Sequence, residues 1–146
     1  MIYGDPEVMR GLSGKPVADL EEQRERLAAV LGRYAGTPYG MWALETREGG
    51  LVGSVLLKPL PESEKIEVGW HLGRAHWGQG YATEAGRGAI EHGFSALGLQ
   101  TIYAVAFGWN EPSLAVMRRL GMQRLGTTDE FYGHELELYC TVREMF

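Results

Sequence analysis

The chain has 146 residues, of which 45% are hydrophobic and 23% are charged, the composition of an ordinary globular protein. Its formal net charge of -5 argues against a nucleic-acid backbone as partner. The sequence has no apolar run long enough to cross a membrane and no cleavable leader pattern, and its one cysteine, Cys140, cannot form an internal disulfide. We therefore expect one domain, residues 1–146, that is cytoplasmic and has no membrane partner.

The N-terminal half is predicted to form two helices and then three strands. Asp5 before Pro6 is typical of a helix N-cap and first turn, and Lys15-Pro16 separates this short helix from a longer one. The longer helix carries a leucine stripe on one face and charged residues on the other. Glu48-Gly49-Gly50 indicates a hairpin turn. The expected second helix and three strands cover residues 17–34, 40–46, 51–58 and 64–72.

The C-terminal half is predicted to alternate helices and strands. A helix begins near Gly80, and a second, shorter helix begins after Asn110 and ends at Leu120-Gly121. The last two strands are expected to form an antiparallel pair. Because the strands do not follow a regular strand–helix–strand repeat, we predict a mixed α/β fold. The longer helix is expected over residues 80–97. The strands are expected over residues 101–107, 122–127 and 135–142.

The turn between the strand at 64–72 and the helix at 80–97 contains two glycines, Gly78 and Gly80. Glycine allows a tight turn and a close approach of ligand to backbone. The first amides of a helix have no partner within the helix, and the helix dipole places partial positive charge there. Strand, turn and helix N-terminus together predict a phosphate or diphosphate site. The sequence lacks the third glycine of a dinucleotide-binding turn, whose position is held by Thr83.

Three segments of the chain resemble the GCN5-related N-acetyltransferase (GNAT) superfamily, in its RimJ/RimL-like branch. Residues 77–82, Trp-Gly-Gln-Gly-Tyr-Ala, are similar to the family's phosphate turn, with Trp77 where Gln or Arg is usual. Residues 110–122 resemble the family's Asn-x-x-Ser helix, and residues 5–9, Asp-Pro-Glu-Val-Met, resemble its early segment. These segments span nearly the whole chain in the family's order.

The resemblance implies a mostly antiparallel mixed sheet with helices on both faces, in which the strands at 64–72 and 101–107 splay apart. The family normally has one more strand before residues 5–9, and only residues 1–4 precede them here. We therefore expect the strand at 40–46 to be an edge with unpaired backbone groups. A second chain or a loop would cover this edge, which makes a homodimer a possible assembly.

The resemblance also implies direct transfer of an acetyl group from acetyl-CoA to a primary amine, which is a protein N-terminus or a small amine. Backbone amides of the glycine turn would hold the diphosphate, and the pantetheine arm would lie beside the end of the strand at 64–72. The residues expected to bind the cosubstrate in these two places are His71, Leu72, Gly73, Gly78, Gln79, Gly80, Tyr81, Ala82 and Thr83.

Three further residues are candidates for the chemistry, each with an alternative role. Glu67 lies where many family members carry a general base, but it could instead be a solvated carboxylate or only bind the cationic amine. Asn110 is expected to contact the cosubstrate and Ser113 to donate a proton to the leaving thiolate, although both residue types are also common helix caps. Weaker candidates for the acceptor side are Tyr103, Tyr132, Tyr139 and His134.

The four histidines show no metal-ligand spacing, so no metal is expected. The alternative function is a catalytically silent module or sensor that binds CoA or acetyl-CoA without turnover.

Overall fold

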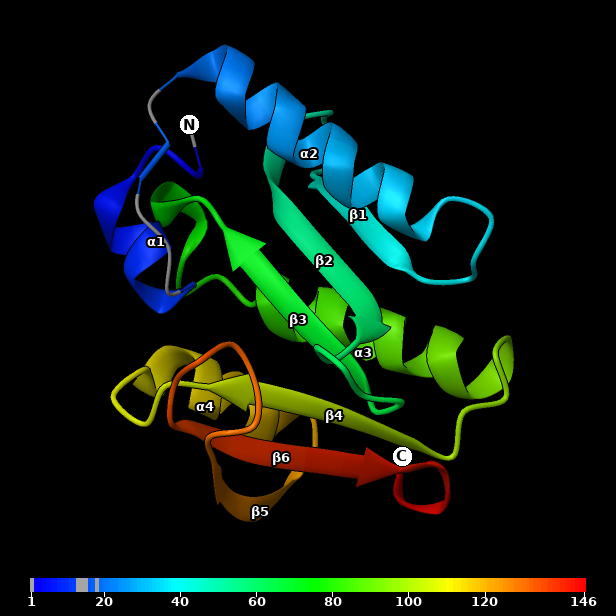
Figure 1. Ribbon diagram of the computed structural model, residues 1–146. Coiled ribbons are helices and arrows are strands. Elements are labelled where there is room, and N and C mark those ends of the chain that lie inside the picture. The colour runs from blue at the N-terminus through cyan, green and yellow to red at the C-terminus, as the bar shows by residue number, and fades with distance from the viewer. Residues whose placement is uncertain (1, 13–15, 18) are drawn as a thin grey trace.

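The computed structural model describes residues 2–12, 16–17 and 19–146. These residues form a six-stranded mixed sheet in the order β1-β2-β3-β4-β6-β5, with helices on both faces (Figure 1). Of the neighbouring strands, only β3 and β4 run parallel, and the other pairs are antiparallel. The predicted mixed α/β fold class is confirmed.

The two N-terminal helices begin at aspartate caps. Helix α1 (Pro6–Gly11) starts with Pro6, and the Asp5 side chain accepts a hydrogen bond from the Glu7 amide, as predicted. Helix α2 (Leu20–Tyr34) is capped in the same way by Asp19, so it begins three residues later than predicted. Lys15, part of the predicted break between the helices, lies outside the described residues.

Strands β1 (Gly40–Glu45), β2 (Leu51–Pro59) and β3 (Ile66–Leu72) form an antiparallel meander. Gly49 adopts a φ of 90° in the first hairpin turn, a conformation that favours glycine, as the sequence predicted. In the second hairpin, Lys58 of β2 lies directly opposite Glu67 of β3. This register brings an ammonium and a carboxylate to the same place on the sheet.

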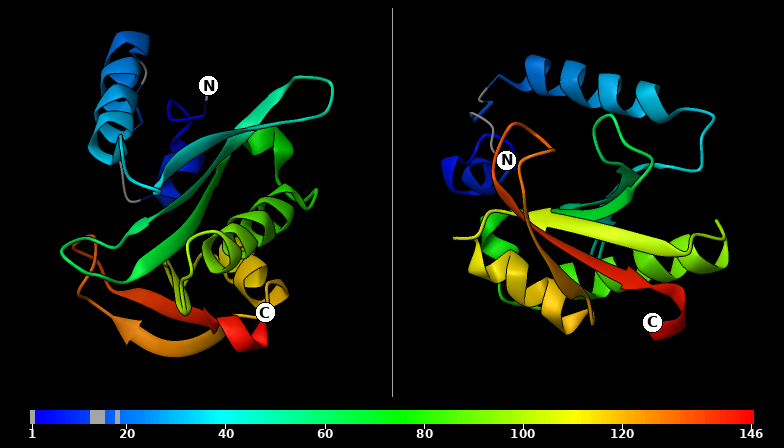
Figure 2. Two further views of the ribbon diagram at one scale, coloured as in Figure 1. Left: turned by 90° about the vertical axis from the view of Figure 1, so that its right-hand side faces the viewer. Right: turned by 60° about the horizontal axis from the view of Figure 1, so that its bottom comes forward.

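Strand β1 ends the sheet on one side, which confirms that it is an edge strand. Helix α2 lies over the face of the sheet opposite α3 and α4 (Figure 2). The leucine stripe of α2 is not covered: Leu20, Leu27 and Leu31 are exposed, as is Trp42 of β1. The expectation that a second chain or a loop covers this edge stays a prediction.

The C-terminal half follows the predicted order, with two short 3-10 helices that the sequence did not indicate. Helix α3 begins at Tyr81 after Gly80, and α4 follows Asn110. Strands β5 and β6 form the predicted antiparallel pair. The elements are η1 (Arg74–His76), α3 (Tyr81–Ser95), β4 (Thr101–Ala106), α4 (Glu111–Arg119), β5 (Gln123–Thr128), β6 (Leu136–Val142) and η2 (Arg143–Met145).

Apolar side chains gather on both faces of the sheet. The larger cluster packs under α3 and α4 and includes Ile90, Ile102 and Met117, each almost fully buried. Alternate residues of β4 point to opposite faces, so Tyr103 and Val105 face a smaller cluster. That smaller cluster is built on Leu60, Phe131 and Leu136.

Strands β3 and β4 pair at one position only, Glu67 opposite Tyr103, and then diverge toward α1 (Figure 1). This confirms the splayed strand pair that the family resemblance implied. The opening leaves room for a ligand between the two strands. Within the part of the chain that the structure describes, no helix has both the length and the apolar character needed to span a bilayer.

Candidate active site

The glycine turn leads into helix α3 through two residues of left-handed conformation. Gly78 has a φ of 74° and Gly80, the N-cap of α3, a φ of 84°. A side chain at these positions would be strained, which explains the glycines. A Cβ built on either residue meets no atom within 4 Å, so this side of the turn faces open space. A ligand can therefore come close to the backbone here.

The start of α3 offers hydrogen-bond donors to such a ligand. The amides of Tyr81, Ala82 and Thr83 precede the first helical bond, which the Glu84 amide makes to the carbonyl of Gly80 at 3.0 Å. The Thr83 hydroxyl is buried and has no hydrogen-bond partner among the described residues. Buried polar groups are normally paired, so an unpaired hydroxyl beside free amides fits a bound anion.

A groove of about 1180 Å³ runs from this turn to the start of α4. Its walls come from α1, the end of β3, the glycine turn with α3, and α4. The volume exceeds that of a typical small-molecule pocket, about 300 to 1,000 Å³. The groove therefore suits an extended ligand with an anionic group at the α3 end.

The end of β3 directs only some of its backbone groups into the groove. The Gly73 amide donates to the carbonyl of Val52 at 2.9 Å, so Gly73 is bonded to β2. Alternate residues of an antiparallel strand bond to the same neighbour, which assigns His71 to β2 as well. Trp70 and Leu72 then point their backbone groups into the opening, where the Leu72 carbonyl accepts the Trp77 indole N–H at 3.0 Å.

The side chain of His71 belongs to a small polar network. Its Nδ1 lies 2.9 Å from the hydroxyl of Tyr3, which is also 2.9 Å from the hydroxyl of Ser54. Burial lowers the pKa of His71 to about 4, and the nearby charge of Lys58 acts in the same direction. The imidazole is therefore neutral at pH 7 and lines the groove without adding charge.

At the start of α4, Asn110 has a structural role. Its side-chain oxygen accepts a hydrogen bond from the Ser113 amide at 3.4 Å, which confirms the capping alternative. The other atom of its amide, Nδ2, faces Gly11: a Cβ there would come within 3.0 Å. Asn110 also lines the groove, so capping leaves its amide N–H groups available to a ligand.

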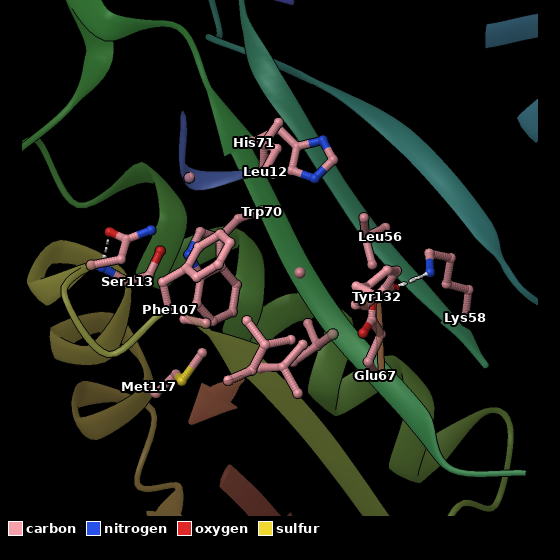
Figure 3. Close-up of a pocket in the computed structure, with 17 residues that line it drawn as sticks. Leu12, Leu56, Lys58, Glu67, Trp70, His71, Phe107, Ser113, Met117 and Tyr132 are labelled. Atoms are coloured by element: carbon pink, nitrogen blue, oxygen red, sulfur yellow. Dashed lines mark hydrogen bonds and ion pairs between the residues drawn. The ribbon is translucent and has the colours of Figure 1, made fainter. Parts of the chain in front are cut away.

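A second hollow, a cavity of about 250 Å³, shares lining residues with the groove. Ser113 lies toward one end of this cavity, and Glu67 lies toward the other with Lys58 and Tyr132 (Figure 3). Two predicted site residues, Glu67 of β3 and Ser113 of α4, thus line the same cavity. The residues that line both hollows are Gly11, Leu12, Trp70, His71, Asn110 and Ser113.

Glu67 is 6% exposed, and its carboxylate has two partners. Its Oε1 accepts a hydrogen bond from the Tyr132 hydroxyl at 2.6 Å and lies 3.2 Å from the Lys58 ammonium. Lys58 also donates to the Tyr132 oxygen at 2.6 Å. The three side chains form a closed triangle, which we call the Lys58–Glu67–Tyr132 triad. Oε2 of Glu67 is enclosed and has no partner among the described residues.

Burial raises the pKa of Glu67, and the charge of Lys58 and the hydrogen bond from Tyr132 offset only part of this effect. Burial also raises the pKa of Tyr132, and the Glu67 charge adds to it. Glu67 therefore takes up a proton more readily than an exposed carboxylate, and Tyr132 remains a hydrogen-bond donor. The alternative of a solvated carboxylate is excluded by its burial.

Sequence reasoning missed Lys58 and named Tyr132 only as a weak candidate. Pairing β2 with β3 through the loop at 60–65 would have placed Lys58 opposite Glu67, but the register was not evident. Tyr132 lies 65 residues from Glu67, and no local pattern links them. In the described ranges, no group of three or more His, Cys, Asp or Glu residues is placed to hold a metal ion.

Comparison with known proteins places this geometry in context. Residues 1–123 match the family model described as "Acetyltransferase (GNAT) domain". An uncharacterized N-acetyltransferase of Bacillus licheniformis is 27% identical over 131 residues, which cover 88% of this chain and 74% of that protein.

Two solved structures share the fold. Spermidine N-acetyltransferase from Vibrio cholerae, in complex with CoA and spermine, has a TM-score of 0.79 at 16% identity and covers 99% of this chain and 87% of its own. The RimL ribosomal α-N-protein acetyltransferase, in complex with coenzyme A, has a TM-score of 0.74 at 17% identity. The match covers 89% of this chain and 76% of the RimL chain. These matches confirm the resemblance inferred from residues 5–9, 77–82 and 110–122.

Proposed function

Because this chain belongs to the GNAT acetyltransferase family and is an N-acetyltransferase, we propose that it transfers acetyl directly from acetyl-CoA to a primary amine. The observation that carries the proposal is the continuity of the two hollows. A long groove with an anion-binding turn at one end opens, at Ser113 and His71, into a cavity that contains a buried carboxylate. Direct transfer requires the binding sites to follow one another in this order: the diphosphate, the pantetheine arm, the reacting thioester and the acceptor amine.

The cosubstrate is proposed to lie along the groove. Amides of residues 78–83 bind the diphosphate, and the Thr83 hydroxyl supplies a further hydrogen bond. The backbone groups of Trp70 and Leu72 are the natural partners for the amides of the pantetheine arm, rather than those of His71 and Gly73, which bond to β2. The V. cholerae and RimL structures contain coenzyme A, which supports acetyl-CoA as the cosubstrate here.

Glu67 is proposed to receive the proton that the acceptor nitrogen loses. The raised pKa of its carboxyl suits a group that accepts a proton near neutral pH. An α-amine, with a pKa of about 8, is already partly neutral at pH 7, so a strong base is not needed. Ser113 lines both hollows, where its hydroxyl is proposed to donate a hydrogen bond to the leaving sulfur.

The acceptor is proposed to enter the cavity by its amine end alone. A volume of about 250 Å³ is smaller than a typical ligand pocket, so the remainder of a larger acceptor must lie outside it. The titles of the two structural neighbours name a polyamine enzyme and a ribosomal-protein enzyme, and acceptors of either class present a primary amine. Either a small amine or a protein N-terminus fits this requirement.

The proposal is tested by incubating the chain with acetyl-CoA and a panel of amines while a thiol reagent records free CoA. The panel should include polyamines, amino acids and short peptides with free N-termini. We expect amine-dependent CoA release that falls by about 100-fold or more in Glu67→Gln, the usual effect of removing a general base. Tight binding of acetyl-CoA without release for any amine would instead identify a silent CoA-binding module.

A further inference from the structure

The carboxylate of Glu67 is enclosed by its neighbours within the Lys58–Glu67–Tyr132 triad. Oε2 has almost no accessible surface, and Oε1 already accepts the Tyr132 hydroxyl at 2.6 Å with the Lys58 ammonium 3.2 Å away. An acceptor nitrogen in the cavity therefore meets the partners of the carboxylate before it meets the carboxylate. A proton that reaches Glu67 needs a path through one of these partners.

Tyr132 is the partner that offers such a path. Tyr132 is 40% exposed and lines the cavity, whereas Glu67 is 6% exposed. A phenol oxygen both donates and accepts hydrogen bonds. Tyr132 donates to Glu67 and accepts from Lys58, and the ammonium of Lys58 has no lone pair with which to accept a proton. Of these two partners of Glu67, Tyr132 is the one that can take a proton on one side and release one on the other.

We propose that Tyr132 relays the proton of the acceptor amine to Glu67, an inference that rests on the proposed function. As the amine attacks the thioester carbonyl, its N–H bond breaks and the proton binds to the Tyr132 oxygen. In the same event the O–H bond of Tyr132 breaks, and its proton forms a new O–H bond at Oε1 of Glu67. The nitrogen loses its positive charge, Glu67 loses its negative charge, and Tyr132 is unchanged. The thiolate leaves with the electron pair of the C–S bond.

The backbone at Tyr132 supports a functional position independently of the hydrogen bonds. Tyr132 has a φ of 59°, which is uncommon for a residue with a side chain, and Gly133 follows with a φ of 71°. The His134 amide donates to the Phe131 carbonyl at 3.4 Å and closes a tight turn around them. Strain of this kind persists only where the surroundings hold it, and it is found preferentially at functional sites.

Phe131 holds this turn in place. It is 3% exposed and packs with Leu60 and Leu136 in the smaller cluster, so the residue after it is directed back toward β2 and β3. Lys58 completes the arrangement, because its ammonium lies 5.1 Å from the centre of the Tyr132 ring and donates to the phenol oxygen. Lys58 is a positioning residue that acts on the other two, and Tyr132 is the group that contacts the acceptor.

The relay is tested with Tyr132→Phe, Glu67→Gln and the double variant, using the best amine of the panel. Both single substitutions interrupt the same proton path, so each should lower kcat by about 100-fold. The double variant should be no slower than either single variant. The affinity for acetyl-CoA should stay unchanged. Tyr39→Phe, which removes a hydroxyl from a tyrosine packed against the larger core cluster, is the matched control and should keep the wild-type kcat.

Two results would overturn the relay while leaving the proposed function intact. One is a kcat of Tyr132→Phe within about threefold of wild type, and the other is a double variant whose loss is the product of the single losses. A measurement that needs no turnover is the carbon-13 NMR titration of the Glu67 carboxyl. Because the Tyr132 hydrogen bond lowers the pKa of Glu67, Tyr132→Phe should raise that pKa further. An unchanged pKa would show that the contact does not exist in solution.

Absence of CoA release by the wild type with every amine would count against the proposed function instead. In that case the titration alone decides whether the Tyr132–Glu67 link exists. The two failures are therefore distinguishable.

Discussion

The two hollows of the candidate active site are built in different ways. The α3 end of the groove, where we propose that the diphosphate binds, is a continuous run, residues 78–83, with open space where side chains at Gly78 and Gly80 would lie. The cavity instead collects side chains from β2, β3 and the loop between β5 and β6. One part of the site depends on local backbone conformation, and the other depends on contacts between distant segments.

This difference predicts how each part responds to change. Substitutions in the glycine turn should alter the affinity for the cosubstrate, because they change what the backbone can approach. Substitutions in the Lys58–Glu67–Tyr132 triad should alter the rate and its pH dependence with little effect on that affinity. The following experiments separate the two parts, beginning with the largest expected effect.

Gly80→Asp should reduce the affinity for acetyl-CoA by about 100-fold or more, because a carboxylate beside the free amides repels the diphosphate. The matched control is Gly36→Asp, since Gly36 also has a positive φ of 78° with open space around its Cβ but lies outside both hollows. The backbone strain is thus similar in the two variants. Isothermal titration calorimetry measures the difference, and wild-type affinity in Gly80→Asp would refute the assignment.

Lys58→Met should slow the reaction most at low pH. The charge of Lys58 lowers the pKa of Glu67, so its removal raises that pKa, and a higher pH is then needed to ionise the base. The acidic limb of the kcat/KM profile should therefore move to higher pH. Lys65→Met, in the same hairpin but exposed, is the control and should leave the profile in place. A uniform loss of kcat/KM across the pH range would contradict the proposed effect of Lys58 on the pKa of Glu67.

Asn110→Ala should lower the free energy of unfolding by about 1 kcal/mol, because α4 loses the side-chain bond to the Ser113 amide. Asn110→Ser should restore most of this stability, since serine is also a good cap, yet it lacks the amide N–H groups that reach the groove. Urea denaturation measures the first effect. If the amide also binds the cosubstrate, both variants should weaken acetyl-CoA binding equally.

The last comparison concerns His71 and the pH dependence of stability. Its pKa in the folded protein, about 4, lies below the ordinary 6.5, so the unfolded chain binds a proton that the folded chain does not. The contribution of this group to stability is complete above about pH 6.5 and is lost as the pH falls toward 4. His71→Asn should remove this part of the pH dependence in thermal unfolding curves, whereas His92→Gln, exposed on α3, should not.

The contrast between the hollows also explains what the sequence could predict. Gly78, Gly80 and the Asp5 cap are local features whose conformation follows from neighbouring residues, and each is found where the sequence placed it. The partners of Glu67 depend on the register of a hairpin and on the turn at Phe131, which are fixed by packing between distant segments. Local sequence patterns do not predict contacts between such distant segments.

Helix α2 shows the same limit at the level of the fold. Its leucine stripe follows the helical period, and the helix forms as predicted, but Leu20, Leu27 and Leu31 remain exposed. The period of the pattern indicates a helix without specifying what covers its apolar face. Likewise, the sequence alone could not assign Asn110 between capping and ligand binding, because one side chain has atoms for both.

The central claim is that the backbone at the start of α3 binds the diphosphate of coenzyme A. The most direct test is a titration of the nitrogen-15-labelled protein with CoA, followed by amide NMR signals. The account predicts the largest shifts at residues 78–83 and none at Gly36. Saturable CoA binding that leaves the signals of residues 78–83 in place and moves those of another region would contradict it.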